Sequence, residues 1–171
     1  MEDKLTTFNS LVSAYQDCVY RLCCSYVRNS EDRKDLMNDI WLRIWTGLES
    51  YKEKSALSTW VFRIATNTSI DFIRREKRHR RRSIGLHRDH LECADTGEDI
   101  EQRTIRSEQI EYLYSCIEQL PLLDKSLISL FLEDLSYSEI ADIIGISESN
   151  VGVKLHWIKK RLNELLGEYA K

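Results

Sequence analysis

Proline and glycine, which most often interrupt helices, are scarce in this chain, with one proline and six glycines among 171 residues. Alternation of apolar and polar residues, the pattern typical of β-strands, is also hard to find. These two shortages predict an all-helical protein, and the 42% apolar content is sufficient for a packed core. The length allows one domain or two small ones.

The sequence has no apolar run long enough to cross a bilayer and no segment typical of a signal peptide. We therefore expect a cytoplasmic protein without membrane insertion. The formal net charge of -3 does not by itself predict nucleic-acid binding, so the distribution of charge along the chain decides that question.

Patterns typical of disulfide frameworks, metal sites and enzymes are also missing. The number of cysteines is odd and none has C-x-x-C spacing: Cys18, Cys23, Cys24, Cys93 and Cys116. We expect buried free thiols, with a metal site or a redox switch as the alternatives. The four histidines show no H-x-x-x-H pattern, and no glycine-rich phosphate loop follows a strand. We therefore expect no catalytic residue, metal or cofactor.

The most informative stretch is Leu135 to Leu166, which predicts two helices joined by a tight turn. Ser136 and Glu139 have the S-x-x-E spacing of a capping box at the start of the first helix. Gly145 stands where a helix C-cap needs a left-handed residue, and Ser147 is placed to cap the second helix.

The spacing of Ala141, Gly145 and Val151 favours a helix-turn-helix. Such a motif needs a small residue where the helices cross, a turn residue tolerant of positive φ, and a branched apolar residue that fixes the second helix. An ordinary helical hairpin is the alternative. It would not explain why the outer face of the second helix is basic, with Lys154, His156, Lys159, Lys160 and Arg161.

Three longer helices are predicted in the first half of the chain, at residues 8–27, 32–48 and 60–82, from apolar residues three or four apart. The tryptophans of the second helix are interpreted as core. Its opposite face carries Asp35, Asn38, Asp39 and Arg43, and periodicity alone indicates a solvated surface.

The third of these helices, with Ser58 or Thr59 as its cap, carries a polar stripe formed by Arg63, Asn67, Asp71, Arg74 and Arg78. It ends in a basic run at residues 74–82. Such a run can release counterions from a phosphate backbone, but a solvated helix end explains it equally well. Asn67 favours the nucleic-acid interpretation, because an amide can read a base edge.

The periodicity lapses between residues 83 and 107, where glutamate and aspartate are frequent. We interpret this segment as a flexible acidic linker between two small helical domains, residues 1–82 and 108–171. In the second domain, Ile110, Leu113 and Ile117 predict one helix, and Pro121 begins another whose inner face includes Leu123.

Several stretches of the sequence resemble conserved regions of one family. They are EDRKDLMNDIWLRIW at 31–45, STWVFRIATNTSIDFIRR at 58–75, LP at 120–121 and LSYSEIADIIGISESNV at 135–151. Together and in this order they resemble the sigma-70 family of bacterial RNA polymerase sigma factors, and specifically the short, two-domain extracytoplasmic-function (ECF) type. The resemblance covers nearly the whole chain apart from the linker.

The resemblance implies a protein that binds core RNA polymerase, directs it to promoters and helps to open the duplex. It implies contacts with the clamp and the flap of the polymerase, and commonly an anti-sigma factor as inhibitor. The clamp of the largest catalytic subunit would bind Asp35, Asn38, Asp39 and Arg43, which replaces the solvated-surface interpretation of that face.

In the same family, the -10 promoter element is held by the third helix and by the loop before it. The loop at residues 50–58 would capture a flipped base. The non-template strand would contact Arg63, Asn67, Asp71, Arg74, Arg75 and Arg78. The linker would thread toward the RNA exit path.

The helix-turn-helix would place its second helix in the major groove of the -35 element. Base edges would meet Glu148, Ser149, Asn150 and Val153, and phosphates would meet Lys154, Lys160 and Arg161. The family usually has polar or basic residues where this chain has Gly152 and Val153, and often arginine in place of Trp157. These departures affect which bases the helix would contact and not the overall role that the resemblance implies. Gly152 also costs about 1 kcal/mol of helix stability relative to alanine.

One alternative is an autonomous transcription regulator that binds an operator through the helix-turn-helix and uses its first domain for dimerisation or ligand binding. Residues 35–45 and 60–75 argue against it, because such a regulator has no reason to carry these segments.

Overall fold

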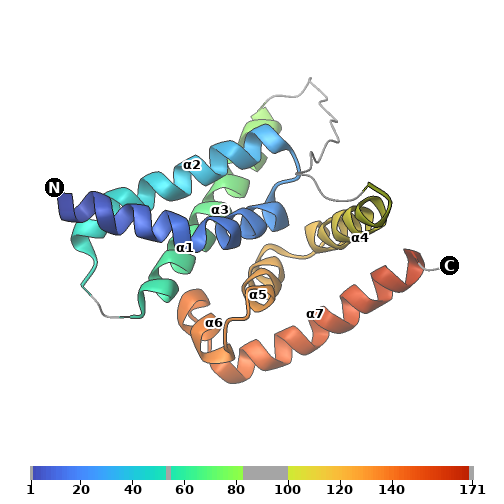
Figure 1. Ribbon diagram of the computed structural model, residues 1–171. Coiled ribbons are helices and arrows are strands. Elements are labelled where there is room, and N and C mark those ends of the chain that lie inside the picture. The colour runs from blue at the N-terminus through green and yellow to red at the C-terminus, as the bar shows by residue number, and fades with distance from the viewer. Residues whose placement is uncertain (1, 53–54, 83–99, 170–171) are drawn as a thin grey trace.

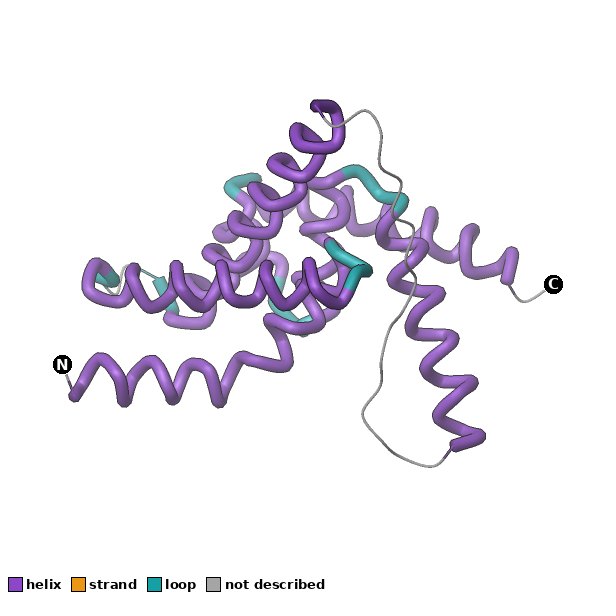
Figure 2. The backbone as a smooth tube through the Cα atoms, turned by 90° about the horizontal axis from the view of Figure 1, so that it is seen from above, coloured by secondary structure: helices purple, strands orange, loops and turns teal. Residues whose placement is uncertain are grey.

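The computed structural model describes residues 2–52, 55–82 and 100–169, and all regular structure within these ranges is helical. The predicted all-helical class is therefore confirmed. Figures 1 and 2 show long helices joined by short loops. None of the helices in the described ranges is long and apolar enough to cross a membrane.

The helices form two groups in chain order. We call the first group the N-terminal lobe; it consists of α1 (Glu2–Tyr26), α2 (Ser30–Gly47), the short 3-10 helix η1 (Leu48–Ser50) and α3 (Leu57–Arg82). We call the second group the C-terminal lobe; it consists of α4 (Ile100–Glu118), α5 (Leu122–Leu132), α6 (Tyr137–Ile144) and α7 (Glu148–Tyr169).

Several helix starts differ from the prediction. Helix α1 begins six residues before Phe8. The prediction missed this start because the first turns are polar and carry no apolar periodicity. Helix α3 begins at Leu57, so the prediction that Ser58 or Thr59 caps it was wrong. The amide of Trp60 donates to the carbonyl of Ala56 at 3.1 Å, which places Ser58 and Thr59 inside the first turn.

The predicted linker was too long at its C-terminal end. Helix α4 begins at Ile100, so residues 100–107 are helical. This segment contains no glycine or proline, and local propensity is enough to extend α4 although apolar periodicity is weak there. The rest of the linker, residues 83–99, lies outside the described residues.

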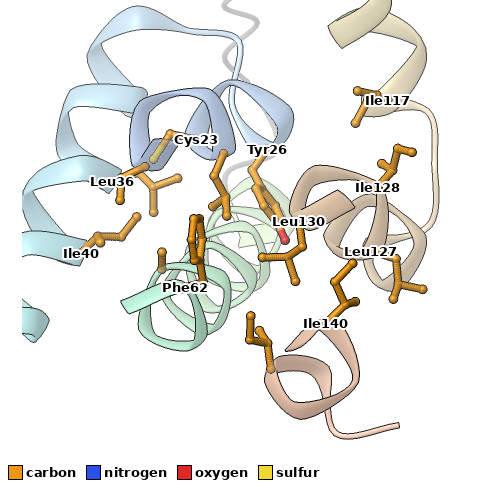
Figure 3. Packing of buried hydrophobic residues seen from close by; sticks show 14 of the residues in the cluster. Cys23, Tyr26, Leu36, Ile40, Phe62, Ile117, Leu127, Ile128, Leu130 and Ile140 are labelled. Atoms are coloured by element: carbon orange, nitrogen blue, oxygen red, sulfur yellow. The ribbon is translucent and has the colours of Figure 1, made fainter. Parts of the chain in front are cut away.

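Packing of α1, α2 and α3 forms the core of the N-terminal lobe. Leu22, Leu36, Ile40 and Val61 are at most 1% exposed, and Figure 3 shows the α1 and α2 side chains of this cluster turned toward Phe62 of α3. The tryptophans of α2 pack edge-on against Phe8, as expected for core residues, with ring centroids at 6.0 Å for Trp41 and 5.1 Å for Trp45.

The C-terminal lobe is organised around α5, which contacts α1 and α3 as well as α4, α6 and α7. Its residues 125–130 are all buried, including Lys125, Ser126 and Ser129. Leu123, predicted to face inward, is instead 38% exposed in the first turn, and Ile110 of α4 is 47% exposed. A helix buried on nearly all sides has no single inner face for periodicity to detect.

The two lobes contact each other through buried polar groups. The phenol hydroxyl of Tyr26 in α1 donates to Ser126 Oγ in α5 at 2.7 Å, and Tyr26 points toward α5 in Figure 3. Arg21 donates two hydrogen bonds to the Glu133 carboxylate, at 2.9 and 2.7 Å. The Glu133 side chain is only 4% exposed, so this carboxylate depends on its partner.

The described cysteines lie in or near this core as free thiols. Cys23, Cys24 and Cys116 are buried and Cys18 is half-buried, while Cys93 lies outside the described residues. Burial raises the pKa of the Cys23 thiol to about 12, so it stays protonated at neutral pH. No group of residues suited to bind a metal is found in the described ranges. The prediction of buried thiols is confirmed for these positions, with Cys18 less buried than the rest.

Arg21→Ala tests the contact between the lobes. The substitution leaves the buried Glu133 carboxylate unpaired, which costs about 1–3 kcal/mol. We expect a less stable contact and a larger radius of gyration in small-angle X-ray scattering of the free chain.

Arg28→Ala is the matched control, because Arg28 lies 3.9 Å from Glu118 in an exposed pair that contributes little. Equal radii of gyration for the wild type and both variants would contradict a role for the Arg21–Glu133 pair.

Candidate nucleic-acid interface

The start of α6 has the predicted capping box. Ser136 Oγ accepts from the backbone amide of Glu139 at 3.3 Å, and the Glu139 carboxylate accepts from the Ser136 amide at 2.9 Å and from its hydroxyl at 2.7 Å. The hydrogen bonds from Ser136 lower the pKa of Glu139. Because these bonds are local, the sequence alone fixes where α6 begins.

The turn between α6 and α7 is also as predicted. Gly145 has φ of +81°, and its amide donates to the carbonyl of Ala141 at 2.8 Å. Ser147 Oγ then accepts from the amide of Asn150 at 3.3 Å, and Val151 is fully buried. The helix-turn-helix predicted from the sequence is therefore present.

Helix α7 buries one face and leaves the opposite face open. Val151, Leu155, Ile158 and Leu162 are at most 5% exposed. The candidate -35 residues Glu148, Ser149, Asn150, Val153, Lys160 and Arg161 are exposed. Figure 1 shows that α7 runs along the outside of the C-terminal lobe.

Two of the basic residues of α7 also contribute to the fold. The ammonium group of Lys154 lies 3.8 Å from Asp124 of α5, and Lys154 is half-buried. The ammonium group of Lys159 lies over the ring of Phe131, 3.6 Å from its centroid. The lysine and arginine side chains of the helix that are exposed are Lys160 and Arg161, and Arg161 lies 3.5 Å from Glu164 of the same helix.

The polar stripe of α3 is only partly open. Asn67, Arg74 and Arg78 are exposed. Arg63 is half-buried, and its guanidinium donates to the backbone carbonyl of Asp142 in α6 at 2.7 Å. The N-terminal end of the stripe therefore lies against the helix-turn-helix, whereas the C-terminal end faces solvent.

The candidate polymerase-binding face of α2 and the candidate -10 residues of α3 are tied together by two ion pairs. Arg75 lies 3.0 Å from Asp39, and Arg43 lies 3.2 Å from Asp71. The carboxylate of Asp71 would repel a phosphate, so we assign Asp71 to the ion pair with Arg43 and not to direct contact with DNA. These exposed pairs join the two faces at the surface, while the buried apolar residues of α2 and α3 hold the helices together.

Leu42 is a candidate residue that sequence reasoning missed. Its side chain is 61% exposed, more than any other large apolar residue in the described part of the chain. It lies on the same face of α2 as Asp35, Asn38 and Asp39, which precede it at helical spacing. An apolar centre with a polar rim is typical of a protein interface. The signal was available, because Leu42 is three or four residues from Asn38 and Asp39.

The loop before α3 is shorter than predicted, because Leu48–Ser50 forms η1 and α3 begins at Leu57. The hydroxyl of Tyr51 donates to the carbonyl of Ser55 at 2.7 Å, and its ring lies 5.2 Å from that of Trp60. Residues 53–54 lie outside the described ranges. Tyr51 therefore joins the two described ends of the loop to each other and packs against α3.

Comparison with known proteins identifies the family of this chain. Residues 11–79 match the family model for sigma-70 region 2, and residues 110–162 match that for sigma-70 region 4. The chain is 30% identical to the ECF RNA polymerase sigma-E factor of Haemophilus influenzae, over 93% of this chain and 89% of that protein. This chain belongs to the sigma-70 family. It is 28% identical to the RNA polymerase sigma factor SigV of Bacillus subtilis, over 91% of this chain and 90% of that protein.

Solved structures of sigma factors share the fold over nearly the whole chain. The sigma factor RpoE of Bartonella quintana, solved with the anti-sigma factor NepR, superposes with a TM-score of 0.77 at 18% identity, over 94% of this chain and 97% of that one. CnrH, solved in complex with the cytosolic domain of CnrY, superposes with a TM-score of 0.69, over 96% of this chain and 90% of that one.

The chain is therefore a sigma factor of the ECF type, and it acts in polymerase-directed transcription initiation. The predicted family is confirmed, and the alternative of an autonomous operator-binding regulator is set aside. The family is one of transcription initiation factors.

Gly152 allows a test of whether α7 is optimised for stability. A Cβ atom added at Gly152 would lie 3.5 Å from the ring of Tyr137, an ordinary contact, and one added at Gly167 would meet nothing within 4 Å. Since glycine inside a helix costs about 0.5–1 kcal/mol relative to alanine, we expect both Gly152→Ala and Gly167→Ala to stabilise the protein in urea denaturation. Destabilisation by Gly152→Ala alone would contradict the packing described for this turn of α7.

Proposed function

We propose that the N-terminal lobe binds core RNA polymerase through α2 and the -10 element through α3, while the C-terminal lobe binds the -35 element through α7. The observation that carries this proposal is the exposed α2 face, on which Leu42 is 61% exposed and follows Asp35, Asn38 and Asp39 at helical spacing. A protein that met DNA alone would have no use for that face. The catalysis of RNA synthesis is then assigned to the polymerase.

In this proposal, the open end of the α3 stripe holds the separated non-template strand. Arg74 and Arg78 supply positive charge, and Asn67 supplies an amide that can pair with a base edge. Asp71 and Arg75 are partly engaged already, through their exposed ion pairs with Arg43 and Asp39 of α2.

The C-terminal lobe binds the -35 element through α7 and also contacts the flap of the polymerase. The exposed N-terminal residues Ser149, Asn150 and Val153 meet base edges in the major groove. Lys160 and Arg161 meet phosphates, which position the helix without reading sequence.

Promoter binding in this way requires the lobes to separate. The two elements are about 25 base pairs apart, or about 85 Å of B-form DNA at roughly 3.4 Å per base pair. Arg63 of the -10 stripe lies 2.7 Å from Asp142 of the helix-turn-helix, so both lobes cannot reach their elements in this arrangement. Separation also frees Arg63 for DNA.

We further propose an anti-sigma factor as a regulatory partner and the cytoplasm as the site of action. The proposal of an anti-sigma factor rests on the structural neighbour from Bartonella quintana, which was solved with the anti-sigma factor NepR. The second rests on the proposed contact with core polymerase, which works in that compartment.

Leu42→Ala tests the polymerase contact. Losing the burial of a leucine costs roughly 1.5–3 kcal/mol, so we expect binding to core polymerase to weaken at least about tenfold. The measurement is a fluorescence-anisotropy titration of the labelled chain with core enzyme.

Leu132→Ala is the matched control, because Leu132 is 45% exposed but lies at the end of α5 in the other lobe. An unchanged affinity for Leu42→Ala would remove this face from the polymerase interface.

Asn67→Ala and Arg74→Ala test the -10 contact. Each should lower open-complex formation about tenfold, as expected for the loss of a contact worth roughly 1–2 kcal/mol, without changing affinity for core polymerase. Permanganate reactivity of unpaired thymines reports opening, and Arg28→Ala controls for the loss of a positive charge. Normal opening by both variants would place the -10 contact elsewhere.

A further inference from the structure

The outward face of α7 carries two large apolar side chains that take no part in the core. Val153 is 55% exposed and Trp157 is 60% exposed. They are four residues apart, so they lie next to each other on the same face of the helix. This face is opposite to the buried row that includes Val151 and Leu155.

Trp157 is 60% exposed, so most of its indole lies outside the packing between helices. Its described ring contacts are with its own helix: the His156 ring at 5.6 Å and the Lys160 ammonium at 5.5 Å. The other three tryptophans lie against aromatic rings of other segments, as Trp60 does against Tyr51. The fold therefore gives no reason for an indole at position 157.

The surroundings of this apolar pair indicate what it binds. Lys160 and Arg161 follow it toward the C-terminus of α7, and Ser149 and Asn150 precede it, all of them exposed. Basic residues next to an apolar pair can bind a ligand that has an anionic backbone beside an exposed apolar group. The major groove of DNA fits this description, because thymine presents a C5-methyl group there.

The chemistry of the two side chains narrows the choice of base. Guanine is read by paired donors such as those of arginine, and adenine is read by amides. Valine offers neither donor nor acceptor, and the indole offers a single N–H that cannot form a paired contact. Both can bury a methyl group.

We infer that Val153 and Trp157 form an apolar reading patch that selects thymine in the -35 element through its methyl group. This inference rests on the proposed placement of α7 in that element, and it adds Trp157 as a specificity-determining residue.

The test uses holoenzyme reconstituted from the full chain and core polymerase. A promoter library with a randomised -35 region is first selected for binding, and we expect thymine to be enriched at one or two adjacent positions. Each such thymine is then replaced by uracil, which keeps all hydrogen-bonding groups and removes only the methyl. We expect about a fourfold loss of affinity for each contacted methyl, from the transfer free energy of one methylene-sized group.

Substitutions in α7 distinguish recognition of the thymine methyl group from sequence-independent binding to DNA. Trp157→Ala and Val153→Ala should remove the sensitivity to uracil, without changing the thermal unfolding of the free chain. Arg161→Ala is the control: it should weaken binding to all sequences about equally and leave the ratio between thymine and uracil promoters unchanged.

The outcomes distinguish this inference from the proposed function. A holoenzyme that selects promoters but ignores the loss of the methyl groups would overturn the reading patch and leave the function intact. A Trp157→Ala variant that binds core polymerase more weakly in the absence of DNA would also overturn it, and would assign the indole to the polymerase surface. Failure of the holoenzyme to select any -35 sequence would count against the proposed function itself.

Discussion

Burial of α5 between the two lobes is the constraint on which the rest of this structure depends. The helix contacts α1 and α3 on one side and α4, α6 and α7 on the other, as its central position in Figure 1 shows. Its serines make this possible, because Ser129 Oγ donates to the carbonyl of Lys125 at 2.7 Å and Ser126 Oγ to that of Leu122 at 2.9 Å. A buried hydroxyl is tolerated when it is hydrogen-bonded, and small side chains let α1 approach.

The same contact divides the functional surfaces into open and covered parts. The α2 face, the C-terminal end of the α3 stripe and the outer face of α7 stay open, while Arg63 is engaged by the carbonyl of Asp142. The contact includes polar groups such as the Arg21–Glu133 pair and the Tyr26–Ser126 hydrogen bond, beside the apolar cluster to which both lobes contribute. Polar contacts can exchange their partners for water at modest net cost, so this interface resists separation less than a purely apolar one of the same extent would.

The sequence predicted best those features that depend on neighbouring residues. The capping box of Ser136 and Glu139, the positive φ of Gly145 and the buried face of α7 all involve residues within one or two turns of each other. Features that depend on distant residues were not predictable. The hydrogen bond from Arg63 to Asp142 joins residues 79 positions apart, and the burial of residues 125–130 of α5 depends on contacts with both lobes. Leu42 lies between these cases, because helical spacing placed it among the polar residues but could not show that nothing covers it.

The central claim is that the lobes touch in the free chain and separate when the sigma factor, mounted on core polymerase, meets a promoter. The most direct measurement is pulsed electron paramagnetic resonance between two spin labels, introduced as unnatural amino acids at the exposed positions Lys34 in α2 and Asn163 in α7. The account predicts one short distance for the free chain and a distance longer by tens of ångströms in the promoter complex, since the two elements lie about 85 Å apart. The same distance in both states would contradict it.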